Sequence, residues 1–176
     1  MKTNATDPYT VQWTAPEDGY SYKVSYKKAT ESNWTHVNSI TTTEYSFPNL
    51  SAGTEYQVRV YSVKSGECSN PREIRFYTKP NAPAFTDPQI TRTSITLNWE
   101  YPTESYSRVL VYYVKNGYYY CIKQIKYSDS SKPTSATITD LQSDTDYSFA
   151  IVSVAGNDES TNYYTNTSRI AYKTLE

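Results

Sequence analysis

The amino-acid sequence predicts an all-β chain that folds as two antiparallel β-sandwiches in tandem. Three observations support this prediction: the residue usage, landmark residues that recur along the chain, and short runs of alternating apolar and polar residues. There are 20 Tyr among 176 residues, with many Thr and Val, and these types favour the pleated, half-buried surface of a sheet. A chain of this length can form two domains of about 90 residues each.

A tryptophan-bearing strand occurs twice in the sequence. Residues 9–16 and 94–102 each alternate apolar and polar side chains, reach a tryptophan (Trp13 and Trp99) and meet a proline three residues later. Alternation over such a run indicates a strand with one buried face. The proline ends the strand because it has no N–H to donate to a neighbouring strand.

A second landmark also recurs. Leu50 is followed by three residues, a Thr, an acid and Tyr56, and then by an alternating run; Leu141 and Tyr147 occupy the same pattern. The tryptophans are 86 residues apart and the tyrosines are 91 apart. The second copy therefore carries about five extra residues between its landmarks. We expect them near residues 115–117, where Asn-Gly favours a tight hairpin turn.

The boundary between the copies is predicted within residues 78–83, a stretch with two prolines and no apolar periodicity that is typical of a short, stiff linker. The predicted domains are residues 1–80 and 81–176. The remaining predicted strands are Tyr22–Lys28, Thr35–Ile40, Glu44–Phe47, Glu55–Val63 and Arg72–Thr78 in the first copy, and Arg108–Lys115, Tyr118–Tyr127, Ser135–Thr139, Asp146–Val154 and Thr167–Lys173 in the second. About seven short strands per copy are typical of an immunoglobulin-like sandwich. Only Met1 to Thr6 remain for a first edge strand in the first copy, so we expect that strand to be truncated.

These landmarks resemble the fibronectin type III family. The resemblance implies a buried tryptophan on the second strand, an inward-packed leucine, and a tyrosine corner whose hydroxyl bonds back to the upstream backbone. The matching residues are, in that order, Trp13 and Trp99, Leu50 and Leu141, and Tyr56 and Tyr147. The family usually has glycine in the corner loop. Gly53 fits this pattern and Asp144 departs from it, so we expect the second corner turn to differ.

The resemblance implies a non-catalytic extracellular segment that binds proteins, mediates adhesion or spaces other domains. The arrangement is similar to the ectodomains of receptor-type protein tyrosine phosphatases and other cell-surface receptors. Expected partners are a protein ligand or neighbouring modules of the same chain. Two alternatives stay open: spacer modules of a secreted enzyme, such as a microbial polysaccharide hydrolase, and a cytokine-receptor-like pair. The cytokine-receptor pattern of several disulfides and a Trp-Ser-x-Trp-Ser box is absent from the sequence.

The charge pattern gives no reason to expect nucleic acid as a partner. There are 17 Lys and Arg against 18 Asp and Glu, and a net charge near zero does not attract a polyanion. The basic residues are scattered singly, so the sequence shows no basic patch. No apolar segment approaches the roughly 20 residues that cross a bilayer, and we expect no membrane insertion within this fragment.

No catalytic, cofactor-binding or metal-binding set is recognisable. The single histidine, His36, lies in a predicted edge strand and cannot supply a His-rich metal site. Cys-x-x-Cys, a Gly-rich phosphate loop and a Gly-x-Ser-x-Gly turn are all absent. Asp140, Asp144 and Asp146 cluster near a corner, and we expect them to be solvated rather than to bind calcium.

The two cysteines occupy non-matching places in the two copies. Cys68 falls in a predicted loop, and Cys121 falls on the strand after Asn116-Gly117. A disulfide needs Cα atoms within about 7 Å, and in an end-to-end arrangement these residues would lie too far apart. We therefore expect no bond between them, and a free Cys121 on a buried strand face.

Four Asn-x-Ser/Thr sequons are glycosylation candidates: Asn4, Asn33, Asn49 and Asn166. Asn33 falls in a predicted loop, and Asn49 lies beside the corner residue Leu50 with its side chain free to face water. Asn4 lies near the end of the chain, and Asn166 opens the last predicted strand.

The run Tyr118, Tyr119 and Tyr120 is the surface feature of greatest interest. Consecutive residues on a strand point to opposite faces, so at least one of each pair is expected to be exposed. Exposed tyrosine clusters are typical of protein interfaces, and this run is the predicted partner surface. The alternative is that these rings cover a sheet face and pack on neighbouring Lys stems.

Overall fold

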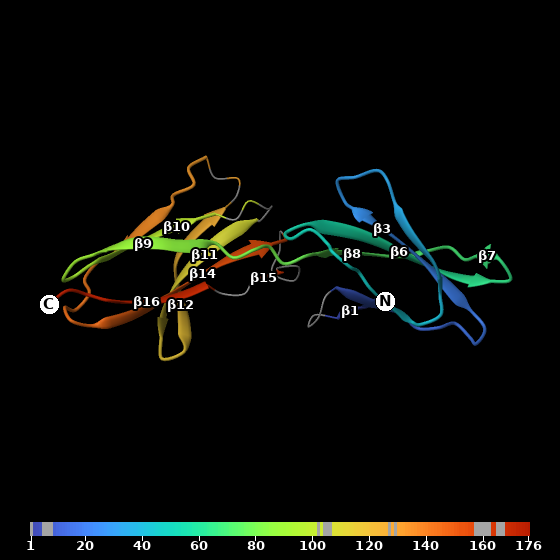
Figure 1. The fold of residues 1–176 in the computed structure, drawn as a ribbon, viewed down its shortest axis with the longest axis horizontal. Coiled ribbons are helices and arrows are strands. Elements are labelled where there is room, and N and C mark those ends of the chain that lie inside the picture. The colour runs from blue at the N-terminus through green and yellow to red at the C-terminus, as the bar shows by residue number, and fades with distance from the viewer. Residues whose placement is uncertain are drawn as a thin grey trace. The chain divides into compact units, whose positions relative to one another are not determined.

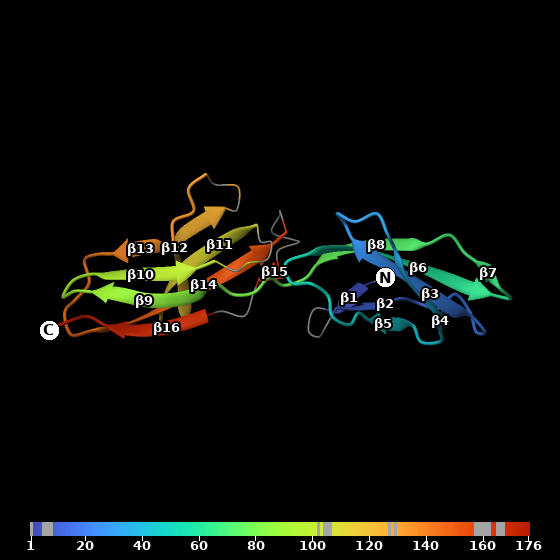
Figure 2. The ribbon, with the colours of Figure 1, turned by 45° about the horizontal axis from the view of Figure 1, so that its top comes forward.

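The computed structural model describes residues 2–4, 9–101, 103, 107–126, 128, 130–156, 163–164 and 168–176. Its elements within those ranges are antiparallel strands (Figures 1 and 2). The described residues form no helix with the length and hydrophobicity that crossing a bilayer requires. The chain divides into two compact units, Met1–Thr78 (unit 1) and Lys79–Glu176 (unit 2). The predicted fold class, tandem antiparallel β-sandwiches, is confirmed.

Unit 1 contains two sheets. The smaller has the strand order β1–β2–β5, and the larger has the order β4–β3–β6–β7 with β8 also pairing β6. The strands are β1 Lys2–Asn4, β2 Thr10–Gln12, β3 Ser21–Lys28, β4 Thr35–Ile40, β5 Glu44–Ser46, β6 Glu55–Lys64, β7 Glu67–Cys68 and β8 Arg72–Tyr77.

Unit 2 repeats this topology. The smaller sheet has the order β13–β10–β9, and the larger has the order β12–β11–β14–β15 with β16 also pairing β14. The strands are β9 Ala84–Ile90, β10 Ile95–Glu100, β11 Arg108–Lys115, β12 Tyr118–Lys126, β13 Ser135–Ile138, β14 Asp146–Ala155, β15 Tyr163–Tyr164 and β16 Ser168–Lys173. In both units the final strand is split in two, and both pieces pair with the same central strand, β6 or β14.

The ten strands predicted with explicit bounds match these elements within two residues wherever the structure describes them; Tyr127 and Thr167 lie outside the described residues. Of the two tryptophan-bearing runs, β10 contains Trp99 as predicted, but β2 ends at Gln12, so the expectation that Trp13 lies buried on a strand was wrong. Strand β9 was not predicted. Its middle reads Thr86-Asp87-Pro88, which breaks the apolar alternation. The structure accommodates Pro88 because β9 is an edge strand whose register to β10 shifts at this point, and proline is tolerated at edges and bulges.

The extra residues of the second copy do not lie where the sequence suggested. The hairpin β3–β4 is joined by residues 29–34, whereas β11–β12 turns on Asn116 and Gly117 alone. The additional length lies in β12, which has 9 residues against 6 in β4. It also lies in residues 127–134, which connect β12 to β13. The expectation of an insertion at residues 115–117 was therefore wrong: the Asn-Gly signal marks a tighter turn, not a longer one.

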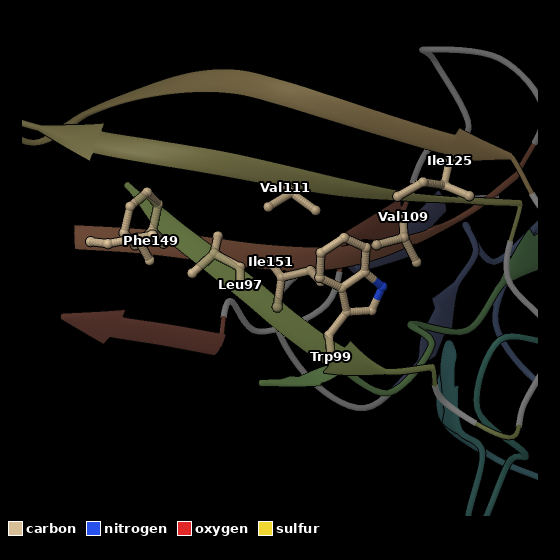
Figure 3. Close-up of a cluster of buried hydrophobic side chains, with 8 residues drawn as sticks. Leu97, Trp99, Val109, Val111, Ile125, Phe149 and Ile151 are labelled. Atoms are coloured by element: carbon tan, nitrogen blue, oxygen red, sulfur yellow. The ribbon is translucent and has the colours of Figure 1, made fainter. Parts of the chain in front are cut away.

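The core of unit 2 is formed by side chains from the facing sheets (Figure 3). Trp99 on β10 is 2% exposed and packs with residues of β11, β12 and β14. Leu141 and Tyr147 are partly buried against this cluster. Its eight buried members are Ile95, Leu97, Trp99, Val109, Val111, Ile125, Phe149 and Ile151.

The core of unit 1 is richer in aromatic rings. Phe47, 3% exposed, lies with its ring centroid 5.0 Å from that of Tyr26, 4.9 Å from Tyr45 and 5.9 Å from Phe76. Edge-to-face contacts of this kind add to the free energy of area burial. The other buried hydrophobic residues of this unit are Val11, Tyr22, Val24, Tyr56, Val58 and Val60.

Both units contain the same tyrosine corner. The backbone N–H of Ser51 donates to the Tyr56 hydroxyl at 3.0 Å, and the N–H of Gln142 donates to the Tyr147 hydroxyl at 2.9 Å. Gly53 and Asp144 share a left-handed backbone, with φ of 59° and 51°. The expectation that the second corner would differ was wrong, because aspartate tolerates this conformation better than most residues.

A threonine after the last strand holds each corner in place, and sequence analysis missed it. The Thr78 hydroxyl donates to the carbonyl oxygen of Ser51 at 2.6 Å, and the N–H of Thr54 donates to the Thr78 hydroxyl at 2.9 Å. Thr174 makes the corresponding bonds to Gln142 and Thr145, at 2.6 and 3.0 Å. The available signal was that a threonine ends the final strand in both copies.

Candidate binding surface

The β11–β12 hairpin of unit 2 carries the predicted tyrosine surface. Register pairs Tyr113 with Tyr120 and Lys115 with Tyr118, and these residues lie on the same face as the core residues Val109 and Val111 because side chains alternate along a strand. Tyr118 and Tyr120 are nevertheless 70% and 53% exposed. The hairpin therefore extends past the part of the opposite sheet that covers the core, and its yellow tip projects from unit 2 in Figure 1.

The exposed rings are connected to the core by Tyr113. This partly buried ring packs against the core cluster, with its centroid 6.0 Å from Phe149 and 6.3 Å from Tyr120. A contact that reaches the rigid core restrains Tyr120 without burying it. Ordered, exposed aromatic side chains lose little conformational entropy when a partner binds.

A second aromatic group lies on the outer face of the same sheet. Tyr119, 39% exposed, lies edge-on to Tyr112 with ring centroids 5.7 Å apart. Arg169 on β16 donates to the Tyr119 hydroxyl, and its guanidinium carbon lies 5.3 Å from the ring centroid. The tyrosines therefore point to both faces, as alternation predicted, and all three are exposed.

The hairpin is also basic, although its cations are scattered singly along the sequence. Residues 107–126 contain four cations, Arg108, Lys115, Lys123 and Lys126, and no Asp or Glu. Arg108 lies directly opposite Lys126 in the register. Cations that are scattered along the sequence thus lie on one hairpin once the strands pair.

Both cysteines are exposed, free thiols. Cys68 lies in β7 rather than in a loop, and Cys121 lies opposite Tyr112 on the outer face of the hairpin. The expectation of a buried Cys121 was wrong. The outer face of β12 at the edge of its sheet has no covering layer among the described strands.

The structure describes the side chains of two of the four sequon asparagines, Asn33 and Asn49. Asn33 is exposed in the β3–β4 loop, and Asn49 is exposed in a left-handed conformation with φ of 55°. Asn4 lies in β1, where only the backbone is described, and Asn166 lies outside the described residues.

His36 is exposed on the edge strand β4, and its Nδ1 lies 2.8 Å from the Ser25 hydroxyl oxygen. Ser25 is only 1% exposed, so this hydroxyl cannot reach a substrate in solution. Asp140, Asp144 and Asp146 are all exposed, and Asp144 pairs with Lys173. The described residues contain no group of His, Cys, Asp and Glu suited to hold a metal ion.

The outer face of unit 1 carries a compact charged cluster. Arg59 lies with its guanidinium carbon 4.4 Å from the Trp34 ring centroid, and its Nε donates to Glu73 at 2.8 Å. Gln57 donates to the other oxygen of this carboxylate. The hydrogen bond from Arg59, followed by that from Gln57, lowers the pKa of Glu73. Arg59 is thus paired within the unit.

A groove of about 500 Å³ lies between the sheets of unit 1, beside Trp13. Trp13 remains partly exposed there, unlike Trp99. The residues that line the groove are Trp13, Thr14, Pro16, Val60, Ser62, Ser69, Asn70 and Arg72.

Comparisons with known proteins agree with this architecture. The family model described as "Fibronectin type III domain" matches residues 1–75 and 79–166. A segment of two fibronectin type III domains from chicken tenascin is similar at 23% identity, with a TM-score of 0.59 and 98% of each chain covered. The FN1–FN3 domains of chicken CNTN1 match at 19% identity and a TM-score of 0.39, over 96% of this chain and 62% of that one. Because the family model accounts for most of the sequence in two successive segments, the chain belongs to the fibronectin type III family and comprises two such domains in tandem.

Proposed function

We propose that this chain is a non-catalytic extracellular segment of a multi-domain cell-surface receptor, possessing a protein-binding surface on the β11–β12 hairpin of its second domain. The observation that carries this proposal is the exposure of Tyr118 and Tyr120, at 70% and 53%, on a hairpin anchored to the core through Tyr113. Tyrosine is enriched at the energetic centres of protein interfaces. A neighbouring module of the same parent protein is included among its possible ligands.

The family supports the extracellular assignment and the module's role in binding or spacing. Exposed sequons at Asn33 and Asn49 are compatible with passage through a secretory pathway. A resemblance to receptor-type phosphatase ectodomains concerns only the arrangement of such modules, and any phosphatase activity would belong to another domain.

The direct test is a double substitution, Tyr118→Ser with Tyr120→Ser. Tetramers of the chain, labelled with a fluorophore, are applied to cultured cells and bound fluorescence is counted by flow cytometry. We expect the double variant to lose at least about tenfold in apparent affinity, because removing interface aromatic side chains typically costs 1–4 kcal/mol. Its thermal unfolding should match that of the wild type, since both side chains are exposed.

The matched control is Leu175→Ser, which removes another exposed apolar side chain, 54% exposed, from the same domain. This control should bind as the wild type does. Equal binding by the double tyrosine variant and the wild type would end the proposal that this hairpin is the partner surface.

Glycosylation tests the cellular location separately. When the chain is expressed with a secretion signal in mammalian cells, we expect glycan mass on Asn33 and Asn49, each lost in the Asn→Gln variant. Unmodified asparagine at all four sequons, measured by peptide mass spectrometry, would argue against a eukaryotic cell-surface protein.

A further inference from the structure

We propose that the β11–β12 hairpin binds an acidic, extended peptide segment of a partner protein, which adds as a strand along the free edge of β12. This inference rests on the proposed protein-binding function and specifies the chemistry of its ligand. Three features of the described residues support it. The hairpin carries positive charges and no carboxylate, the backbone of β12 has an unpaired edge, and aromatic side chains are exposed on both faces of that edge.

The charge distribution favours an anionic partner. The chain as a whole has a net charge of −1, yet residues 107–126 hold four cations and no carboxylate. In the described structure no salt bridge involves Arg108, Lys115 or Lys123, and Arg108 faces Lys126 across the hairpin. An acidic strand beside this hairpin would be attracted by its excess of positive charge.

The backbone of β12 is open along one side. Strand β12 ends its sheet in the described topology, with β11 as its neighbour. Asn116 and Gly117 have φ of 51° and 80°, the values of a type I′ turn, which closes on a hydrogen-bonded Lys115–Tyr118 pair. Bonded and non-bonded pairs alternate from this turn as far as the register shift between Val111 and Tyr112, so Tyr119 and Cys121 direct their N–H and C=O groups toward the free edge. An exposed edge of this kind is a template for an added strand.

The side chains beside this edge can hold both faces of an added strand. Tyr118 and Tyr120 lie on the core side, and Tyr119 lies on the outer side against Tyr112 and Arg169. Lys123 and Lys126 follow further along the same strand. Aromatic rings and cations therefore both lie beside this edge, so a bound strand should carry apolar residues as well as carboxylates.

A synthetic peptide tests the inference on the full chain. The probe is the acetylated, amidated octapeptide Glu-Val-Glu-Val-Thr-Val-Glu-Val, titrated at about 50 mM and about 500 mM NaCl. We expect binding at low salt that weakens at high salt. Amide hydrogen exchange at Tyr119 and Cys121 should slow on binding, whereas the exchange of Tyr118 and Tyr120, already bonded to β11, should change little.

Two variants with the same change of net charge separate local from global electrostatics. Lys123→Glu with Lys126→Glu should weaken peptide binding by about tenfold or more. Arg72→Glu with Arg92→Glu, at exposed positions on β8 of unit 1 and in the β9–β10 turn of unit 2, should leave it unchanged. Should the lysine variant fail to fold, the two-salt titration and the exchange of Tyr119 and Cys121 in the wild type still decide the matter.

Two further ligands distinguish strand addition from simple anion binding. The same peptide with proline at its two central positions keeps its charge but cannot pair as a strand, so it should not bind. A heparin octasaccharide supplies charge without a peptide backbone. Equal binding of the proline peptide, or binding of heparin without binding of the parent peptide, overturns the proposal. If cell binding depends on Tyr118 and Tyr120 while the peptide fails, the protein-binding function stands and strand addition is wrong.

Discussion

The two domains fill the same topology with different side chains. In unit 1 Phe47 lies at the centre of an aromatic group with Tyr26, Tyr45 and Phe76. In unit 2 the corresponding space is filled mainly by aliphatic residues around Trp99. What the domains share is the corner, with its tyrosine and threonine hydrogen bonds. Directional polar contacts fix where strands meet, whereas apolar volume can be supplied in several ways.

The tryptophans show the clearest difference between the domains. Phe85 of β9 lies opposite Trp99, whereas the described part of β1 pairs only as far as Gln12, one residue before Trp13. Trp99 is consequently 2% exposed and Trp13 remains partly exposed beside its groove. The same residue type at the same landmark thus has a different environment because its neighbouring edge strand differs.

The largest predicted effect tests this difference. Trp99→Ala should destabilise unit 2 by about 3–5 kcal/mol, the cost of emptying a fully buried aromatic site. Trp13→Ala should cost unit 1 less, about 2 kcal/mol, since water already reaches part of the ring. Urea unfolding followed by NMR signals specific to each domain measures the two losses separately. A loss for Trp13→Ala equal to that of Trp99→Ala would contradict this account.

The hairpins provide the next comparison. Gly117→Ala should cost unit 2 about 1–2 kcal/mol, because φ of 80° is unfavourable for a residue with a Cβ. The loss should be purely conformational, since a Cβ there would meet no atom within 4 Å. Ser32→Ala, in the longer loop of unit 1, should change stability by less than about 0.5 kcal/mol. Equal losses in the two denaturation curves would show that turn geometry does not distinguish the hairpins.

The corners should respond equally to substitution. Tyr56→Phe and Tyr147→Phe each remove the acceptor of one backbone N–H, at a cost of about 1 kcal/mol in the free energy of unfolding. The two losses should agree within about 0.5 kcal/mol because the hydrogen-bond lengths, 3.0 and 2.9 Å, are nearly the same. A distinctly smaller loss for Tyr147→Phe would mean that Asp144 weakens the second corner after all.

The smallest predicted effect concerns Glu73. The hydrogen bonds from Arg59 and Gln57 hold its pKa below its ordinary value of 4.5. A lowered carboxyl pKa contributes stability above the pKa of the unfolded state, and this contribution disappears as the pH falls through the folded-state value. The ion pair is solvent-accessible, so the contribution should stay below about 1 kcal/mol. Glu73→Gln should lower the melting temperature of unit 1 slightly at pH 7 and not at pH 3.

Glu31→Gln, which removes an exposed partner of Lys28, serves as the matched control. It should leave the pH dependence of unit 1 unchanged. A wild-type advantage over Glu73→Gln that persists at pH 3 would show that the carboxylate's charge is not its source.

Much of the fold could be predicted from the sequence because its signals are local. Alternation around Trp13 and Trp99 indicated the strands, and the Leu-x-x-x-Thr-acid-Tyr pattern marked each corner. Strand β9 was not predicted because Pro88 interrupts its pattern. An edge strand tolerates this proline, but whether a strand lies at an edge depends on the whole sheet and cannot be seen in the segment itself. The shared left-handed turn of Gly53 and Asp144 was not predicted because the family's usual glycine was weighed above aspartate's tolerance of this conformation.

The candidate surface was only partly predictable for the same reason. Tyr118, Tyr119 and Tyr120 stand out in the sequence, and their alternation predicts that some are exposed. The extent of their exposure depends on how far the hairpin extends past the opposite sheet, which no local pattern reveals. The gathering of Arg108 with Lys126 likewise depends on register, although a count of charges over residues 107–126 would have raised the question.

The threonine at the end of unit 1 has a mechanical consequence. Thr78 is the last residue of unit 1, and its hydroxyl and backbone N–H are bonded to the corner residues Ser51 and Thr54. A force that pulls on the chain beyond Thr78 therefore acts on these corner hydrogen bonds before it acts on β8. The hydrogen bonds between β8 and β6 run across the strands, so pulling along β8 loads them together in shear instead of opening them one at a time.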